Sequence, residues 1–321
     1  MTRRSAVPPP VTAVLDASSR WLPARLGEVE ESLRAAVAGH GERLEGDATA
    51  TLAAGGKRLR PMLVLLCAGE AGGEGSVRAA TAIELVHMAT LVHDDVLDQA
   101  QLRRGQPTVA ASSGRARAVA TGDLLLSRAF ALLASAGDGR AVALLASASV
   151  ALARGELAQR HDAFDLAVSE ERYLERCRLK TARLFECACR LGRDDEQLGG
   201  FGAEVGLAFQ LLDDVLDVAG PPERTGKARG TDLLDGTITL PLIEAAASDP
   251  GIREVDLHGL DPATAEALCE RIAATGALDR VRARALEMVA AAKQRLRQPA
   301  FSPEQRQLLE LVADGVVQRY S

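Results

Sequence analysis

The five residues Asp-Asp-Val-Leu-Asp occur twice in this chain of 321 residues, at 94–98 and at 213–217. In each copy the first and last Asp are four residues apart, so a helix would place both on one face. Carboxylates at this spacing repel each other, and the neighbouring leucines increase the cost of their charges. A divalent cation would remove the conflict, and Mg²⁺ fits because phosphate oxygens and water complete its shell. We therefore expect a metal site made of Asp94, Asp98, Asp213 and Asp217.

Two alternatives bear on the repeated motif. A single copy in an acidic protein is usually a solvated helix face, but two identical copies with apolar flanks favour a shared function. An EF-hand is excluded, because neither copy has the alternating Asp spacing, the turn glycine or the final Glu.

Basic residues that could bind an anion lie near both ends of the first motif. Lys57 and Arg60 are three apart in the segment 55–61, and we expect them to project together from an early helical turn. The glycines before that turn would let the backbone approach an anion, although a solvated helix start is the alternative. Arg103 and Arg104 follow the motif, where they either neutralise it or grip a diphosphate through paired hydrogen bonds.

His87 lies two helical turns before Asp94, so it either faces the same ligand or is a satisfied structural residue. Gln210 would share a helical stripe with Asp213 and Asp217. The other weak candidates for an anion site are Lys180, Thr181 and Lys227.

The remaining residues favour one type of chemistry. The segments around the motifs are rich in Ala, Leu and Val, and the sequence contains no Ser/His/Asp grouping and no His-Glu-x-x-His. Such a site suits the metal-assisted departure of diphosphate and a carbocation sheltered in an apolar cavity.

The composition is that of a helix-rich globular protein. Hydrophobic residues make up 47% and aromatic residues only 3%, while Ala, Leu, Arg and Glu dominate. The net charge of −6 and the lack of a basic stripe argue against nucleic-acid binding. Five cysteines without a Cys-x-x-Cys pair predict reduced thiols in the cytoplasm. The apolar run at 63–68 is too short to span a membrane, and the first residues lack a signal-peptide core.

Helical periodicity runs through the chain and predicts one all-α domain of about ten to thirteen helices at 13–321, after a disordered lead-in at 1–12. Breaks fall at Gly- and Pro-rich points, and no long linker divides the chain. The expected helices lie near 22–37, 60–70, 77–99, 115–135, 140–159, 170–191, 197–218, 233–247, 263–275, 278–296 and 303–319.

Taken together, the motifs resemble the polyprenyl synthetase family of trans-isoprenyl diphosphate synthases. They follow the family's order over about residues 40–245, and the resemblance implies a bundle of mostly antiparallel helices around a central cavity, usually as a homodimer. The matching segments are GGKRLRP (55–61), HMATLVHDDVLD (87–98), RRGQPT (103–108), GEL (155–157), LKTARL (179–184), FQLLDDVLD (209–217) and GKARGTDLLDGTITLPL (226–242).

The resemblance also implies roles for individual residues. An allylic diphosphate ionises, the double bond of isopentenyl diphosphate attacks, and a proton is lost, with up to about three Mg²⁺ ions assisting. The metal ligands would be Asp94, Asp98, Asp213 and Asp217. Isopentenyl diphosphate would be held by Lys57, Arg60, His87 and Arg104. The allylic substrate would be held by Arg103, Lys180, Thr181, Gln210 and Lys227, and the catalytic set would be Asp94, Asp98, Asp213, Lys180 and Lys227.

Two features bear on the product and the substrate. The resemblance implies that the residues four and five positions before the first Asp close the cavity, and here they are the small Thr90 and Ala89. An open floor favours a long product of roughly C30–C50, with Leu125 or Phe130 as a deeper limit, whereas the geranylgeranyl (C20) product is the alternative. Many relatives carry Lys where this chain has Thr237, which would weaken one diphosphate contact.

Other classes are less well supported by the same residues. A class I terpene cyclase shares the first Asp motif, but its second motif usually differs from 213–217 and its cavity is richer in aromatic residues. A non-catalytic subunit of a two-chain synthase tends to lose the Asp motifs, and both are intact here. Transient contact with a membrane would serve product release.

Overall fold

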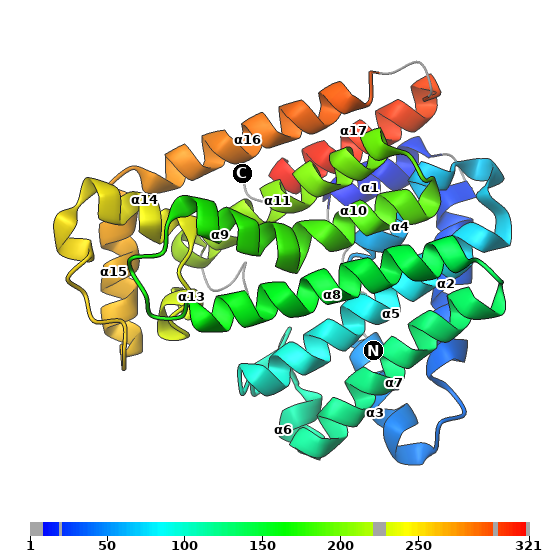
Figure 1. Ribbon diagram of the computed structural model, residues 1–321, viewed down its shortest axis with the longest axis horizontal. Coiled ribbons are helices and arrows are strands. Elements are labelled where there is room, and N and C mark those ends of the chain that lie inside the picture. Colours follow the sequence, from blue (N-terminus) through cyan, green and yellow to red (C-terminus); the bar gives the residue numbers. More distant parts are fainter. Residues whose placement is uncertain (1–8, 19–20, 221–228, 298–300, 319–321) are drawn as a thin grey trace.

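A computed structural model shows a bundle of helices and describes residues 9–18, 21–220, 229–297 and 301–318. In Figure 1, helix α16 runs along one side of the bundle and helix α7 along the opposite side, with the other long helices between them. The prediction of an all-α fold is confirmed.

The helices vary widely in length. The longest are α2 (Trp21–Val37), α5 (Gly73–Leu97), α7 (Arg115–Ser135), α8 (Gly139–His161), α11 (Glu196–Ala219), α16 (Ala277–Arg295) and α17 (Pro303–Gln318). The shorter ones are α1 (Pro9–Ala17), α3 (Glu42–Ala53), α4 (Leu59–Ala68), α6 (Val109–Ser113), α9 (Glu170–Cys177), α10 (Arg183–Gly192), α13 (Thr231–Leu234), α14 (Leu240–Ser248) and α15 (Pro262–Ala274). Single turns are η1 (Glu70–Gly72), η2 (Arg178–Ala182), which is a π turn, and η3 (Pro250–Ile252).

Two strands interrupt the helical pattern after the first Asp motif. Strand β1 (Leu102–Arg103) pairs antiparallel with β2 (Gln106–Pro107). The turn between them has φ of 53° at Arg104 and 73° at Gly105. Two consecutive positive φ values are typical of a tight hairpin turn, and they explain why a glycine follows the two arginines.

Most expected helices match the structure, but helix α3 was not predicted. Its sequence has a glycine and three threonine or aspartate residues among the apolar positions, which dilutes the helical pattern. Helix α3 is fixed by tertiary contacts instead: Asp47 accepts hydrogen bonds from Ser113 (2.8 Å) and Arg117 (2.8 Å). The predicted lead-in also extends too far, because α1 begins at Pro9 and packs against α17. Proline is well tolerated in a first helical turn.

Capping residues define where the helices around the site begin. Helix α11 follows Asp195, whose Oδ1 accepts the N–H groups of Gln197 (2.8 Å) and Leu198 (3.0 Å). Helix α8 follows Asp138, whose carboxylate accepts the N–H of Ala141 at 2.9 Å. These side chains satisfy backbone donors that have no partner inside the helix.

Helices α5 and α11, which carry the two Asp motifs, form the centre of the bundle. Helix α5 packs against α7 and α4, and α11 packs against α16 and α10. Nearly every residue of α5 from Val77 to Ala89 is buried. A helix that is apolar on most faces requires neighbours all around it, so these two helices are held firmly.

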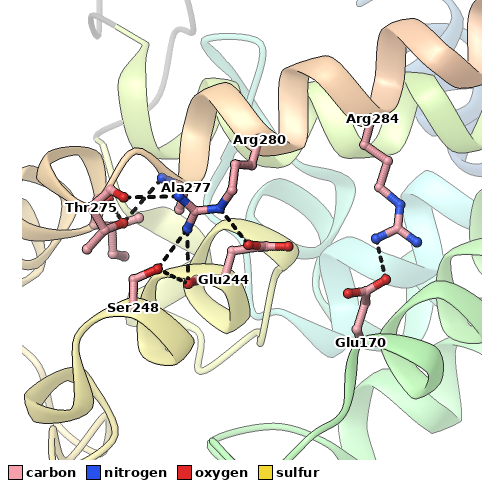
Figure 2. A network of polar contacts seen from close by, with 8 residues as sticks. Glu170, Glu244, Ser248, Thr275, Ala277, Arg280 and Arg284 are labelled. Carbon is pink, nitrogen blue, oxygen red and sulfur yellow. Dashed lines mark hydrogen bonds and ion pairs between the residues drawn. The ribbon is translucent and has the colours of Figure 1, made fainter.

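Helix α16 is fastened to the rest of the bundle by two arginines (Figure 2). Arg280 donates to Glu244 Oε2 (2.8 Å), to the Ser248 hydroxyl (2.9 Å) and to the carbonyl of Thr275 (3.1 Å). One turn further along, Arg284 pairs with Glu170 at the start of α9. These contacts tie α9, α14 and α16 together on the side of the bundle away from α7.

Helices α7 and α8 are the only described helices long and apolar enough to be considered as membrane spans. One third of the apolar window of each is buried in the bundle. Length and composition alone are weak evidence for insertion, because core helices of water-exposed proteins meet the same criteria.

Candidate active site

Both Asp motifs lie at the carboxyl ends of long helices. Asp94 is in the last turn of α5 and Asp98 follows its last residue, while Asp213 and Asp217 are in the last two turns of α11. The carboxyl end of a helix carries partial negative charge, so carboxylates at this position increase the local negative potential. The two motifs therefore form an arrangement that is favourable only with cations nearby.

The environment of Asp94 disfavours its negative charge. Burial raises the pKa of the Asp94 carboxyl to about 6, with Lys180 opposing the shift and Glu156 and Asp98 adding to it. Within the described ranges, no group of three or more His, Cys, Asp or Glu side chains is arranged so that it could hold a metal ion.

The second aspartate of the first motif, Asp95, has a different role from the two outer aspartates. Asp95 is 5% exposed, and its Oδ1 accepts hydrogen bonds from Arg103 Nε and Nη2, both at 2.8 Å. Arg103 was predicted to hold the allylic substrate, but in this structure it holds Asp95 and thereby connects the hairpin to α5. Such a paired contact fixes orientation as well as charge.

Asp98 is linked to Lys180 through a chain of alternating charges. Arg160, near the end of α8, donates through Nη2 to Asp98 and through Nε to Glu156 Oε1 at 3.0 Å. The second oxygen of Glu156 pairs with Lys180 Nζ. The sequence reading did not single out Arg160 or Glu156, although the motif at 155–157 contains the latter.

Lys180 and Thr181 lie in the π turn η2 between α9 and α10. A Cβ atom at Gly155 would lie 2.5 Å from the backbone nitrogen of Lys180, and one at Gly206 would lie 2.9 Å from the Cα atom of Ala182. The two glycines thus let α8 and α11 approach the turn from both sides. Single π turns within helices are frequent at functional sites, and this one displaces Lys180 from a regular helical position.

The second Asp motif is held by hydrogen bonds. Asp214 is buried and accepts from the hydroxyl of Tyr173 (2.6 Å) and from Gln210 Nε2 (2.7 Å). The hydroxyl of Thr181 donates to Gln210 Oε1 at 2.7 Å. Burial raises the pKa of the Asp214 carboxyl to about 8, and the charge of Asp232 adds to the shift.

This network adds a contact that the sequence did not reveal. Gln210 lies on the same helix as Asp213 and Asp217, as expected, and its amide donates to Asp214, four residues along that helix. Neighbours at four residues lie as close on a helix as those at three, so spacing alone does not select the partner. Asp213 itself is exposed at the surface of the site.

Asp217 joins the end of α11 to the segment that follows residue 228. Its Oδ2 accepts the N–H of Asp232 at 3.1 Å, and its carbonyl accepts the N–H of Gly230 at 3.0 Å. Thr237 is half-buried, and its N–H donates to the carbonyl of Asp232 at 2.8 Å. Lys227, predicted to bind the allylic substrate, lies outside the described residues.

A basic cluster lies beside the first motif. Burial lowers the pKa of the His87 imidazole well below its usual value, and the charges of Arg60, Arg104 and Arg103 lower it further. His87 is therefore neutral and surrounded by guanidinium groups. Burial also lowers the pKa of Arg60 to about 10, and its guanidinium stacks on the Phe185 ring at 4.6 Å.

The segment before α4 differs from the prediction. Helix α4 begins at Leu59, so Lys57 precedes the helix and does not share its first turn with Arg60. The intervening Arg58 adopts a φ of 48° and pairs with Glu30 and with the buried Glu84 (2.8 Å). Arg58 is thus a positioning residue that the sequence pattern did not distinguish from its basic neighbours.

The residues predicted to form the floor of the cavity lie on α5 and α7. Ala89 is buried, and the hydroxyl of Thr90 donates to the carbonyl of His87 at 2.8 Å. Both lie one turn before Asp94 on α5. On α7, Leu125 is fully buried and Phe130 is partly buried against the core.

Comparisons with known proteins identify the family. A family model described as polyprenyl synthetase matches residues 42–272. The heptaprenyl diphosphate synthase component 2 of Geobacillus stearothermophilus is 39% identical over 278 residues, which cover 83% of this chain and 87% of the relative. The geranylgeranyl diphosphate synthase of Methanosarcina mazei is 34% identical over 284 residues, which cover 83% and 86%.

A solved structure is similar over almost its whole length. The polyprenyl synthase of Caulobacter crescentus CB15, complexed with calcium and isoprenyl diphosphate, has a TM-score of 0.89 and 35% sequence identity. The match covers 96% of this chain and 98% of that one. The chain belongs to the polyprenyl synthetase family. It is thus a prenyl transferase of the trans-polyprenyl diphosphate synthase class, a class that generally depends on divalent metal ions and binds isoprenyl diphosphates.

Proposed function

We propose that this chain condenses isopentenyl diphosphate with an allylic diphosphate in a Mg²⁺-dependent, head-to-tail reaction that yields a trans-polyprenyl diphosphate of roughly C30–C50. The observation that carries the proposal is the position of the two identical Asp motifs at the carboxyl ends of α5 and α11, beside a cluster of arginines. Clustered carboxylates and clustered cations side by side are what a metal diphosphate requires.

The metal is assigned to the outer carboxylates of the two motifs. These are Asp94 and Asp98 on α5 and Asp213 and Asp217 on α11, which would hold up to about three Mg²⁺ ions together with substrate oxygens. A divalent cation bound there supplies charge neutralisation to the departing diphosphate. Asp95 and Asp214, by contrast, are engaged by protein groups, so we assign them positioning roles.

Isopentenyl diphosphate is assigned to the basic cluster of Lys57, Arg60, His87 and Arg104. Arg60 retains its charge at neutral pH despite burial, because its pKa is about 10. A neutral His87 has one N–H group, which can donate to a phosphate oxygen without adding charge. Gly56 adds close access, since a Cβ there would lie 3.5 Å from Arg104 Nη1.

The allylic substrate is assigned to Arg103, Lys180, Thr181, Gln210 and Lys227, with Lys180 and Lys227 in the catalytic set because they would neutralise its diphosphate. Lys180 is paired with Glu156, and Thr181 donates to Gln210. The Lys180 ammonium has three N–H donors, so it can bind a phosphate oxygen while Glu156 continues to orient it. Thr237 supplies no cation at its position, so Lys180 and Lys227 carry more of that charge.

The product length is assigned from the small side chains at the floor. Ala89 and Thr90 leave more space below Asp94 than bulky residues would, and Leu125 or Phe130 would limit growth further down. The named relatives include both a heptaprenyl and a geranylgeranyl synthase, so the C20 product is the competing candidate. The two candidate products differ only in how far the growing prenyl chain would extend past α5.

A variant of Ala89 tests this assignment. Ala89→Phe fills the floor, and we expect its main product to be at least two isoprene units shorter than that of the wild type. The control is Ala134→Phe, which places the same ring on an exposed position of α7. Chromatographic sizing of the dephosphorylated products provides the measurement, and identical product distributions would show that the floor lies elsewhere.

A second copy of the chain is the proposed partner. Val150 and Leu157 on α8 are 61% and 71% exposed, and Val119 on α7 is 39% exposed. Long apolar helices with this much uncovered surface favour association, and any part of that surface left outside the dimer would allow brief membrane contact during product release. Light scattering should give a mass of about twice 33.8 kDa.

A partner of a different sequence is the alternative. The similar protein from Geobacillus stearothermophilus is named as component 2 of a synthase, which favours a second, unlike chain. Consumption of isopentenyl diphosphate by the purified chain alone would exclude that requirement. We place the protein in the cytoplasm, supported by five cysteines that are all free and buried.

The deciding experiment is a product assay. Purified chain is incubated with labelled isopentenyl diphosphate, Mg²⁺ and, in separate reactions, geranyl, farnesyl or geranylgeranyl diphosphate. Products of C30 or longer would support the proposal, whereas a stop at C20 would favour the alternative. Failure to extend any primer would contradict the function proposed for this chain acting alone.

A further inference from the structure

The carboxylate of Asp98 is engaged by a cation of the protein itself. Arg160 Nη2 donates to Asp98 Oδ1, and Arg160 Nε donates to Glu156 Oε1 at 3.0 Å. Glu156 also pairs with Lys180. A single guanidinium group thus connects the end of α5 to the end of α8.

The two partners of Arg160 differ in their exposure and in their other contacts. The side chain of Glu156 is 13% exposed and carries two cationic partners, whereas Asp98 is 34% exposed. Ion pairs that are open to solvent contribute little and are screened by mobile ions. The contact with Glu156 is thus the better shielded of the two, and the contact with Asp98 is the more accessible to a competing cation.

We propose that Arg160 occupies the metal-ligand position of Asp98 until a divalent cation displaces it, and then turns about its anchor at Glu156. The inference rests on the proposed role of Asp98 as a metal ligand. Before metal binds, Arg160 compensates the repulsion between Asp94 and Asp98 at the negative end of α5. Arg160 is a positioning residue that sets the concentration of divalent cation at which the site fills.

The test is a titration of the full-length chain with Mn²⁺ alone, without substrate, followed by electron paramagnetic resonance. Arg160→Gln removes the competing cation, so we expect the Kd for Mn²⁺ to fall about two- to fivefold, the range that follows from a partly exposed ion pair. The stabilisation that Mn²⁺ gives in thermal unfolding should increase in parallel. Arg140→Gln is the matched control, because Arg140 lies at the opposite end of α8 and contacts Asp194 and the carbonyl of Arg190.

Two further variants separate displacement from a general effect of charge. Arg160→Lys keeps the charge but lacks the fork that spans both carboxylates, so it should also bind Mn²⁺ more tightly than the wild type. In an Asp98→Asn background, Arg160→Gln should have no further effect on Mn²⁺ affinity, because the shared contact is already absent.

The outcomes distinguish this inference from the proposed function. If Asp98→Asn alone leaves Mn²⁺ affinity unchanged, Asp98 is not a metal ligand and both proposals for it fail. If Asp98→Asn weakens Mn²⁺ binding but Arg160→Gln leaves it unchanged or weaker, the displacement inference alone is overturned. An undiminished effect of Arg160→Gln in the Asp98→Asn background would overturn it as well.

Discussion

The two copies of the same pentapeptide are held in different ways. In the first copy the second aspartate, Asp95, pairs with the guanidinium of Arg103, and Asp98 pairs with Arg160. In the second copy the equivalent aspartate, Asp214, accepts hydrogen bonds from Tyr173 and Gln210. Identical residues on two similar helices therefore acquire different electrostatic properties from their neighbours.

The two halves of the site are therefore suited to different roles in binding metal. Ion pairs near solvent exchange with mobile ions and weaken with salt, whereas a buried hydrogen-bond network keeps its geometry. The end of α5 is thus suited to exchanging one cation for another. The end of α11 is suited to presenting Asp213 and Asp217 from a fixed frame.

The largest expected effect separates an outer carboxylate from a middle one. Asp94→Asn removes a proposed metal ligand, and we expect activity to fall by roughly 10²–10³-fold. Asp214→Asn should cost less than about tenfold, because Asp214, with a pKa of about 8, is already largely protonated at neutral pH. Steady-state rates of isopentenyl transfer provide the comparison, and equal losses in the two variants would contradict the division between them.

A smaller effect is expected from the glycine that fits α8 against the π turn. Gly155→Ala places a Cβ 2.5 Å from the Lys180 backbone nitrogen, so the turn must move. We expect a loss of about 1–3 kcal/mol in the free energy of unfolding, together with a lower rate, because Lys180 moves with the turn. Gly46→Ala in α3 is the control, since nothing lies within 4 Å of its added Cβ. Denaturant unfolding of both variants supplies the measurement, and equal stabilities would show that the turn adapts freely.

The smallest effect concerns pH. The pKa of the Asp214 carboxyl is about 8 in the folded chain and 3.8 when the environment of the fold is lost on unfolding. Between about pH 4 and 8 the folded state therefore holds a proton that the unfolded state lacks. That contribution is present in acid and is lost as the pH rises toward 8. Thermal unfolding without metal should therefore show Tm of the wild type falling between pH 5.5 and 8.5 by about 3–6 °C more than Tm of Asp214→Asn. Parallel curves for the two proteins would mean that Asp214 is ionised in the folded chain throughout.

The sequence predicts the positions of the site residues better than their partners. Helical spacing correctly predicted that Asp94 and Asp98 end one long helix and that Asp213 and Asp217 end another. It could not show that Gln210 contacts Asp214, because spacings of three and four residues are equally close on a helix.

Contacts between segments that are distant in the sequence could not be predicted from it. The pairing of Asp98 with Arg160 joins residues 62 positions apart, and a π turn has no recognisable pattern of its own. The helical start expected for Lys57 was wrong, because Glu30 and Glu84 hold Arg58 in a conformation that local preference disfavours. Tertiary partners decided each of these points.

In the proposed reaction, both Asp motifs bind metal on one allylic diphosphate. The most direct test of this claim is the stoichiometry of Mn²⁺ bound in the presence of an unreactive allylic thiodiphosphate, measured by electron paramagnetic resonance for the wild type, Asp94→Asn and Asp213→Asn. We predict that each variant binds fewer Mn²⁺ ions than the wild type and binds the thiodiphosphate more weakly. Wild-type stoichiometry and affinity in Asp213→Asn would contradict the claim, because the second motif would then take no part in the metal site.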